Sequence, residues 1–551
     1  MLVDSGQAWT SGDERPSAGT AYGERGVVAS ASPTAAAVGL GVLQRGGNAF
    51  DAALAVAGVE WLTLPGACGL GGDLFAVAYD ARRDRIVAFN GSGEAARRAS
   101  RDYYVSQGYQ TMPLSGWHAA SVPGAADGYL TLHRELATMP LGELWEPAKR
   151  YAAQGIVVTE RMSRSIAGAA DKLAKFPDTA AIYLPNGEAP RPGSKWRNVN
   201  LARTIETVVR EGAEAFYRGE IAGEMVRAAE AGGGLFGRDE FAEQCTEVYD
   251  PLRVRYRGYD VYATKPPSQG MIVLETLALL EGFDLRRLGF GSAEALHTMV
   301  EAKKLAFADR LRYAGDPRRI DQAPVKQLLQ PAYADRRRRA IDPARAAEKV
   351  EGAPPEMLGG DTSYFCVWDG QGNACSLIHS LSAGFGSGVV AGRTGVILNN
   401  RAGRGFSLEE GHPNVFEGGK KTMHTLNCYL IARDGRPWLV GGTPGGDQQP
   451  QWNVQTITNL IDFGMTPQAA VEAPRWYSFP GTDPEHVRKP FVLRMEQRFS
   501  PEAVAQLQAR GHRVERLGPW AAGGAVQVIQ REGGTLLAGS DPRAGGAALA
   551  F

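Results

Sequence analysis

The apolar pattern of the chain changes at Gly359-Gly360, and this change constrains the fold more than any other feature. Between residues 125 and 240 the pattern has mostly a helical period, whereas after Gly360 short apolar alternations separated by turn residues follow one another. Strands and helices on one chain, with hairpins between the strands, are typical of a layered α/β protein with antiparallel sheets. We predict this fold class for the 551-residue chain.

Apolar periodicity and turn residues predict the individual elements. We expect helices at residues 33–43, 49–61, 201–211, 293–313, 453–463 and 467–473. We expect strands at residues 27–32, 74–79, 85–90, 252–257, 259–262, 362–368, 374–381, 389–398, 426–432 and 437–441. Residues 1–25 are polar and are expected to form a loose leader, and the basic stretch 335–350 a solvated, protease-accessible linker.

Charge and composition exclude several classes of protein. Lys plus Arg and Asp plus Glu both number 60, which argues against a nucleic-acid binder that works by phosphate neutralisation. No uninterrupted apolar stretch reaches the roughly 18 residues of a membrane span, and the N-terminus lacks the basic and apolar regions of a secretory signal. We therefore expect a cytoplasmic protein that binds neither nucleic acid nor membranes.

The distribution of potential metal ligands points away from a metal site. The five cysteines are scattered and lack C-x-x-C spacing, so neither a disulfide framework nor a zinc site is expected. Cys366 and Cys375 lie in apolar runs and are interpreted as small core residues. Gly71-Gly72-Asp73 lacks a phosphate-binding pattern, and His, Cys and carboxylates show no cluster at ligand spacing. We expect neither a metal nor a cofactor.

The segment 359–365, with the sequence GGDTSYF, carries a potential nucleophile. The hydroxyl of Thr362 is a poor nucleophile unless a base lies beside it, and a chain that begins with Thr supplies its own α-amine as that base. The reference pKa of such an amine is about 7.7–8.0, which suits proton transfer near neutral pH. This chemistry requires a cut between Asp361 and Thr362. Taken alone, a Thr that opens a strand is better explained by β-propensity.

Several motifs occur in a fixed order along the chain. They lie at residues 26–30, 46–53, 69–72, 256–259, 266–268, 301–310, 399–400, 443–446 and 539–543. In these motifs the chain resembles the γ-glutamyltransferase (glutathione hydrolase) superfamily of self-processing N-terminal nucleophile hydrolases, from about residue 26 to its end. The resemblance implies an α+β fold, a four-layer αββα sandwich with stacked antiparallel sheets.

The resemblance also implies how the precursor is divided. After a leader at residues 1–25, residues 26–361 would form a helix-rich large subunit and residues 362–551 a strand-rich small subunit that begins with the nucleophile. The two fragments would share one intertwined core, so each is the other's partner. The remaining partner is a small-molecule substrate, and the sequence is compatible with a homo-oligomer.

Carried over by position, the family's catalytic groups fall on four residues. Thr362 is the nucleophile for self-cleavage and for substrate attack, and Ser380 is the hydroxyl that hydrogen-bonds it. Gly445 and Gly446 resemble the oxyanion pair, because backbone N–H groups reach a tetrahedral oxyanion only where no Cβ intrudes. Ser382 is expected two residues beyond Ser380 on the same strand face. A polar alternation and a simple turn are the alternative interpretations of these serines and glycines.

The substrate-binding positions depart from the γ-glutamyl enzymes. The stretch 90–94 has no Arg to hold an α-carboxylate, and the stretch after Asn400 carries Arg401 and Arg404 where the family places an acidic residue. A cation cannot hold an ammonium group, so a glutamyl head is poorly matched. The family's paired serines are replaced by His424-Thr425. Asn400, Arg401, His424, Thr425 and Ser382 are the expected substrate-binding residues, although a surface loop would equally explain Arg404.

These departures resemble the non-glutamyl branches of the superfamily. We expect a threonine-dependent amide or acyl hydrolase, or an acyltransferase, that acts through an acyl-enzyme on a small carboxylate-bearing substrate. Three alternatives stay open. They are a C–C bond hydrolase of an antibiotic pathway, an ordinary γ-glutamyl hydrolase or transpeptidase, and a processing-defective structural homologue.

Overall fold

Two seven-stranded sheets form the centre of the computed structural model, which describes residues 17–350, 362–480 and 489–551. The first sheet has the order β19 (Ala547–Ala550), β2 (Gly26–Ser30), β10 (Ser363–Asp369), β11 (Ala374–Ser380), β3 (Asp73–Asp80), β4 (Arg85–Gly91), β7 (Glu247–Tyr249). The second has the order β1 (Ala21–Gly23), β18 (Thr535–Ser540), β17 (Gln527–Glu532), β13 (Arg436–Gly442), β12 (Cys428–Arg433), β9 (Tyr259–Ala263), β8 (Leu252–Tyr256). All neighbouring strands within each of these two sheets are antiparallel.

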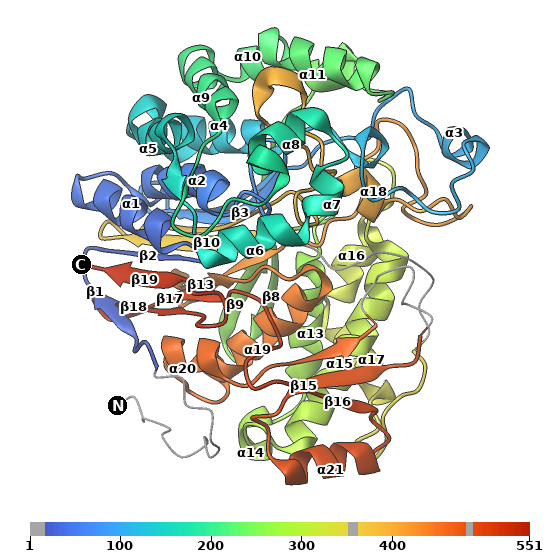
Figure 1. The fold of residues 1–551 in the computed structure, drawn as a ribbon. Coiled ribbons are helices and arrows are strands. Elements are labelled where there is room, and N and C mark those ends of the chain that lie inside the picture. The colour runs from blue at the N-terminus through green and yellow to red at the C-terminus, as the bar shows by residue number, and fades with distance from the viewer. Residues whose placement is uncertain (1–16, 351–361, 481–488) are drawn as a thin grey trace.

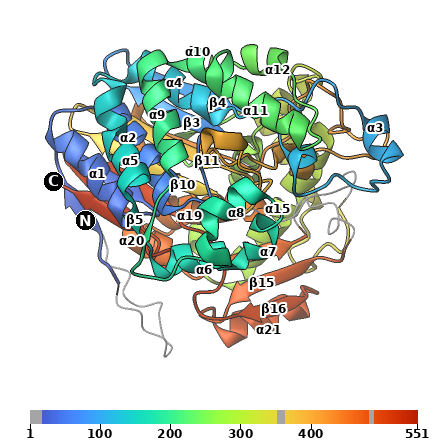
Figure 2. The same ribbon diagram turned by 45° about the horizontal axis from the view of Figure 1, so that its top comes forward.

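Helices cover the outer face of each sheet (Figures 1 and 2). The first sheet is covered by α1 (Pro33–Gln44), α2 (Ala49–Thr63), α4 (Ala125–Leu136), α5 (Leu141–Gln154) and α9 (Val199–Glu211). The second is covered by α13 (Gly270–Leu280), α15 (Ala293–Tyr313) and α19 (Gln449–Ile461). Separate apolar clusters fill the two helix–sheet interfaces and the space between the sheets. The four-layer αββα sandwich is therefore confirmed.

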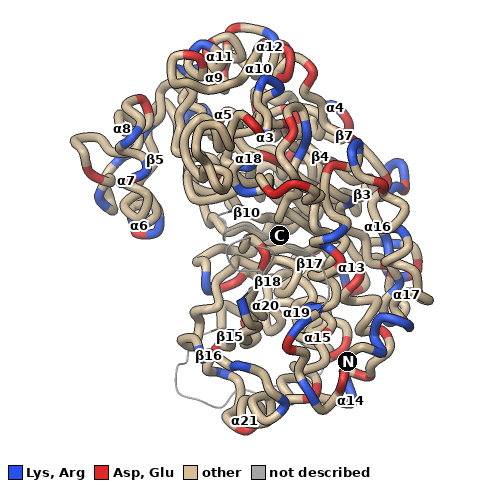
Figure 3. Tube along the Cα trace, turned by 90° about the vertical axis from the view of Figure 1, so that its right-hand side faces the viewer, with Lys and Arg blue, Asp and Glu red and all other residues tan. Residues whose placement is uncertain are grey.

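The remaining elements surround this sandwich. A small sheet orders β14 (Trp476–Phe479), β15 (Val492–Glu496) and β16 (Val514–Leu517), and β5 (Ile156–Val157) pairs with β6 (Lys195–Trp196). The other α-helices are α3 (Arg101–Ser106), α6 (Glu160–Gly168), α7 (Ala170–Leu173), α8 (Pro177–Tyr183), α10 (Ala213–Tyr217), α11 (Glu220–Ala231), α12 (Arg238–Ala242), α14 (Leu285–Leu288), α16 (Ala323–Leu328), α17 (Pro331–Arg337), α18 (Arg401–Gly405), α20 (Pro467–Glu472) and α21 (Pro501–Ala509). Basic and acidic residues are interspersed over the trace (Figure 3). No helix among the described residues has the length and apolar character needed to cross a membrane.

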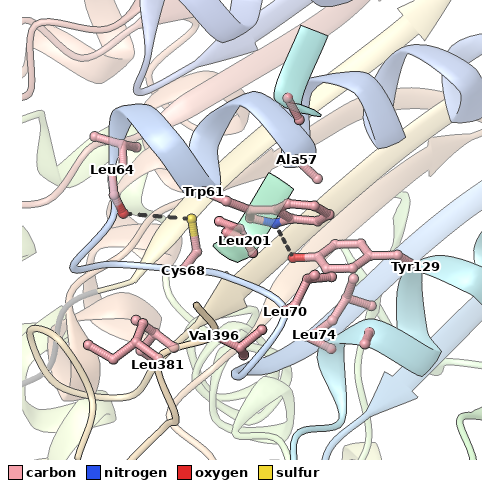
Figure 4. Close-up of a cluster of buried hydrophobic side chains, with 14 of the residues drawn as sticks. Ala57, Trp61, Leu64, Cys68, Leu70, Leu74, Tyr129, Leu201, Leu381 and Val396 are labelled. Carbon is pink, nitrogen blue, oxygen red and sulfur yellow. Dashed lines mark hydrogen bonds between the residues drawn. The ribbon is translucent and has the colours of Figure 1, made fainter. Parts of the chain in front are cut away.

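The helix α2 shows how the sequence builds the outer core. The Asn48 side chain accepts hydrogen bonds from the backbone of Phe50 and Asp51, and Asp51 accepts from the Asn48 backbone, so the first turn is capped in both directions. Its small side chains let neighbouring elements approach closely. Figure 4 shows Trp61 of this helix beside Tyr129, to whose hydroxyl its indole nitrogen donates at 3.2 Å.

Alternation along the strands decides which way the residues at the strand ends point. In β10, Tyr364, Cys366 and Trp368 enter the core between the sheets, whereas Phe365 and Val367 enter the core under the helices. Cys366 and Cys375 are buried core residues, as the sequence predicts. By the same period of two, Thr362 lies on the side of Tyr364 and points into the space between the sheets.

Most predicted elements are confirmed, two expectations are wrong, and a third holds only in part. Residues 389–398 form a loop with one isolated bridge rather than a strand. Part of the supposed leader, Ala21–Gly23, is a strand that pairs with β18; residues 1–16 lie outside the described structure. Most of the basic stretch 335–350 is exposed, as expected, but the stretch is not a linker throughout. It begins in α17, where Arg337 forms an ion pair with Asp309 and Arg338 donates to the Ala278 carbonyl, so these two residues are held against the helical layer.

Candidate active site

Three polar residues form a row across neighbouring strands at one end of the first sheet. Ser363 is the register partner of His379, so Thr362 lies level with Ser380, and Ser380 is the partner of Asp73 on β3. The hydroxyl oxygens of Thr362 and Ser380 are 3.0 Å apart. Strand alternation directs all three side chains into the space between the sheets. The structure thus brings together the predicted nucleophile and its predicted hydroxyl partner.

The glycine loop 443–446 lies at the same end of the sandwich. It follows β13, whose last residue, Gly442, contacts the ring of Tyr364 near the start of β10. Gly445 has φ 137° and Gly446 has φ 57°, a region that residues with a Cβ rarely adopt. A Cβ at Gly445 would also lie 2.4 Å from the Trp452 ring. Both backbone strain and space therefore require glycine at position 445.

Arg401 brings a buried cation to this end of the row. It is the first residue of the short helix α18, its side chain is 0% exposed, and its Nε donates to Asp73 Oδ2 at 3.2 Å. Its Nη1 and Nη2 have no hydrogen-bond partner in the described part of the chain. Burial, opposed by Asp73 and reinforced by the charge of Arg404, lowers the pKa of Arg401 to about 10. The guanidinium stays charged with one edge unoccupied.

His424 approaches the same carboxylate oxygen of Asp73 as Arg401 does. Its Nδ1 is 3.8 Å from Asp73 Oδ2, and its ring meets Phe75 edge-on. Burial, together with the charges of Arg401 and Lys421, lowers the pKa of His424 well below its usual value, so the ring is neutral and its contact with Asp73 is not an ion pair. Neither ring nitrogen, nor Oγ1 of the neighbouring Thr425, has a hydrogen-bond partner among the residues described.

Asp73 is a site residue that sequence reasoning missed. It joins Arg401, His424 and the Gly93 backbone N–H, which donates to it at 3.2 Å. Burial raises the pKa of Asp73, and Arg401 opposes that rise. The sequence feature that could have indicated Asp73 is an acidic residue at the first position of an apolar strand. Its importance becomes visible only once β3 and β11 are paired.

Two of the expected substrate-binding residues, Ser382 and Asn400, form hydrogen bonds within the protein, and so does Arg404. Ser382 is not on the strand face of Ser380, because β11 ends at Ser380 and Ser382 has φ 86°. Its backbone N–H donates to Ser380 Oγ at 2.8 Å, and its carbonyl accepts from Arg404 at 2.9 Å. Arg404 is 1% exposed, which excludes a surface loop. The amide of Asn400 accepts from the Ala383 backbone and donates to the Leu114 carbonyl.

Two groups of potential metal ligands meet in the fold although the sequence spacing does not reveal them. They are Glu60, Cys68 and His379, and His297, Glu301 and His512. His379 is hydrogen-bonded to Glu60 at 2.7 Å and to Tyr129 at 2.6 Å. In the second group the two histidines are hydrogen-bonded to each other at 2.8 Å. Ring nitrogens of these histidines are thus already hydrogen-bonded to other protein groups.

Comparison with known proteins gives matches over nearly the whole chain. A family model described as Gamma-glutamyltranspeptidase matches residues 35–551. The Glutathione hydrolase-like YwrD proenzyme of Bacillus subtilis (strain 168) is 37% identical over 530 residues, 96% of this chain and 98% of that protein. The Oxamate amidohydrolase proenzyme of Klebsiella pneumoniae is 33% identical over 521 residues, 93% and 96% of the two chains. A cephalosporin acylase from Bacillus halodurans superposes with a TM-score of 0.90 at 32% identity, covering 100% of this chain and 99% of that one.

Proposed function

Since the chain belongs to the γ-glutamyltranspeptidase family, we propose that it is a proenzyme that cuts itself between Asp361 and Thr362 and then acts as a threonine-dependent acyl hydrolase or acyltransferase. The observation that carries this proposal is the 3.0 Å contact between the hydroxyls of Thr362 and Ser380. It lies at the end of the sandwich that also holds the glycine loop 443–446. This arrangement supports the assignment of a nucleophile, a hydrogen-bond partner and a source of N–H donors to one end of the sandwich.

The catalytic steps follow from the groups present. The free α-amine of Thr362 accepts the hydroxyl proton while Oγ1 attacks the acyl carbonyl, and the backbone N–H groups of Gly445 and Gly446 stabilise the oxyanion. Collapse breaks the bond to the leaving amine, which takes up the proton, and leaves an ester on Thr362. Water or an acceptor amine then attacks that ester and restores the hydroxyl. Ser380 orients Oγ1 throughout.

The proposed substrate carries a carboxylate on its acyl group and lacks an α-ammonium group. Arg401 presents Nη1 and Nη2 as an unoccupied edge, which is the geometry for two parallel N–H bonds to a carboxylate. The neutral ring of His424 and the hydroxyl of Thr425 offer uncharged hydrogen bonds beside it. An ammonium group would meet the Arg401 cation instead, which disfavours an ordinary γ-glutamyl substrate. The names of the amidohydrolase and acylase relatives agree with this choice.

The first test is the state of the purified chain. We expect two fragments, residues 1–361 and 362–551, with Thr at the N-terminus of the smaller one by mass spectrometry. Thr362→Ala should stay whole and inactive, whereas Thr362→Ser retains a hydroxyl and should still cleave in part. Wild-type protein that stays whole yet hydrolyses substrate would contradict the mechanism.

The second test concerns the substrate. Glutaryl and γ-glutamyl p-nitroanilide are compared on one fully cleaved preparation, because they differ only in the α-ammonium group. We expect the glutaryl compound to have the higher kcat/KM. A preference for the γ-glutamyl compound would reject the proposed pocket while leaving the nucleophile in place.

A further inference from the structure

A buried arginine, which precedes the proposed cut in the sequence, forms an ion pair with the residue that follows the glycine loop. Arg310 of α15 is 0% exposed, and its Nη1 forms an ion pair with Asp447, the residue after Gly446. Its Nε donates to the sulfur of Met423 at 3.0 Å, and Met423 directly precedes His424. One guanidinium therefore connects the glycine loop to the segment that carries His424.

Gln269 makes a second connection between the same two segments. It is 0% exposed and lies directly before α13. Its side-chain nitrogen donates to the Gly446 carbonyl at 3.0 Å and also to the Thr425 carbonyl. Arg310 and Gln269 come from different helical elements, so the two segments are tied together twice.

We propose that Gln269 and Arg310 are positioning residues that fix the direction of the Gly445 and Gly446 N–H groups. The inference rests on the proposed function, in which these groups stabilise the oxyanion. Glycines with positive φ have many accessible conformations and cannot fix the loop by themselves. The fixed points are the Gly446 carbonyl, which Gln269 holds, and the Asp447 carboxylate, which Arg310 holds.

This role predicts a specific kinetic signature. N–H groups stabilise an oxyanion only when they already point at its future position, and the oxyanion exists in the transition state but not in the bound substrate. Loosening the loop therefore lowers kcat and leaves KM nearly unchanged. A merely structural role would lower the amount of folded enzyme without changing kcat per cleaved active site.

The test uses Arg310→Lys and Gln269→Met on the full chain. Lysine keeps the charge at position 310 but loses the fork that reaches both Asp447 and Met423, and methionine removes both donors at position 269 at similar volume. The matched control is Arg337→Gln, which removes the ion pair of the neighbouring residue Asp309 without touching the loop. All proteins are normalised by the amount of N-terminal Thr and assayed with glutaryl p-nitroanilide.

We expect kcat to fall about 10–100-fold in each of the two variants, with KM within about threefold and the pH midpoint of kcat unchanged. The control should keep the wild-type kcat. If one variant fails to fold, the other still decides the outcome. Wild-type kcat in a folded variant, or a rise in KM that accounts for the loss, would overturn the inference. Failure of the proposed function looks different, because wild-type protein would then be uncleaved or inactive.

Discussion

Arg401, which contacts Asp73 of the candidate site, and Arg543, near the C-terminus, both have buried side chains, but the protein compensates the two charges to different extents. The guanidinium of Arg543 binds Glu496 at 2.6 Å and Asp541 at 3.2 Å, and it also donates to the carbonyls of Val471 and Ala473. Arg401 has the single contact with Asp73 at 3.2 Å, and its two terminal nitrogens have no partner in residues 17–350, 362–480 and 489–551.

The pKa values of the two groups differ accordingly. Burial alone lowers the pKa of an arginine, but Asp541 and Glu496 outweigh burial and raise that of Arg543. At Arg401 burial dominates and lowers the pKa to about 10. A buried cation without full compensation destabilises the folded chain, and an external anion at its free edge removes that penalty. The difference separates an arginine that maintains the fold from one that is available to a ligand.

The largest expected effect is on stability, at Arg543. Arg543→Met should lower the free energy of unfolding by about 3 kcal/mol, the lower end for breaking a buried ion pair, because Arg475 and Arg498 still face the two carboxylates. Denaturant unfolding measures it. The ratio of glutaryl to γ-glutamyl turnover in the folded fraction should not change. A changed ratio would show that Arg543 also reaches the substrate.

The next effect is on substrate choice. Arg401→Met should lower kcat/KM for glutaryl p-nitroanilide by about 10–150-fold, the equivalent of a charge-assisted contact of about 1.5–3 kcal/mol. Arg401→Lys serves as the control and should be intermediate, because an ammonium cannot form two parallel bonds. The loss of stability should be smaller than in Arg543→Met. An unchanged glutaryl rate would place Arg401 among the purely structural arginines.

The pH dependence of turnover gives a smaller effect with a defined sign. In wild-type enzyme kcat should rise with pH as the Thr362 amine loses its proton. Because the His424 ring is already neutral, it should add no further step to the pH profile of kcat. Arg401 is one of the charges that lower the pKa of His424, so Arg401→Met should raise that pKa toward its usual value. The ring signals of His424 in NMR titrations measure the change. Arg543→Met is the control and should leave the pKa of His424 unchanged.

An exposed ion pair sets the lower limit of these effects. Arg345 and Glu348 are 3.1 Å apart, with side chains 74% and 80% exposed. Arg345→Ala should change the free energy of unfolding by less than about 0.5 kcal/mol, because water solvates both charges once they separate. A larger loss in denaturant unfolding would mean that burial is not what distinguishes Arg543.

The sequence predicted what depends on local pattern. The helix 293–313 and the hairpin around residues 369–373 follow from apolar periodicity and turn residues, and the motif positions placed Thr362 opposite Ser380. Asp73, Gln269 and Arg310 were not predicted, because their roles arise from contacts between segments more than 100 residues apart. The loop 389–398 was misread because its apolar residues are buried by neighbouring elements without forming a ladder.

The order of strands in the first sheet has a consequence for the matured molecule. β10 and β11, which follow Thr362, lie between β2 and β3, which precede it, and β12 pairs with β9 in the second sheet. The last strand β19 also pairs with β2, and β18 pairs with β1, so pulling the two fragments apart requires opening five strand ladders. If the chain is cut at the proposed position, we therefore expect that fragments of different molecules do not exchange while the protein is native. The two pieces of one molecule should then stay associated on dilution.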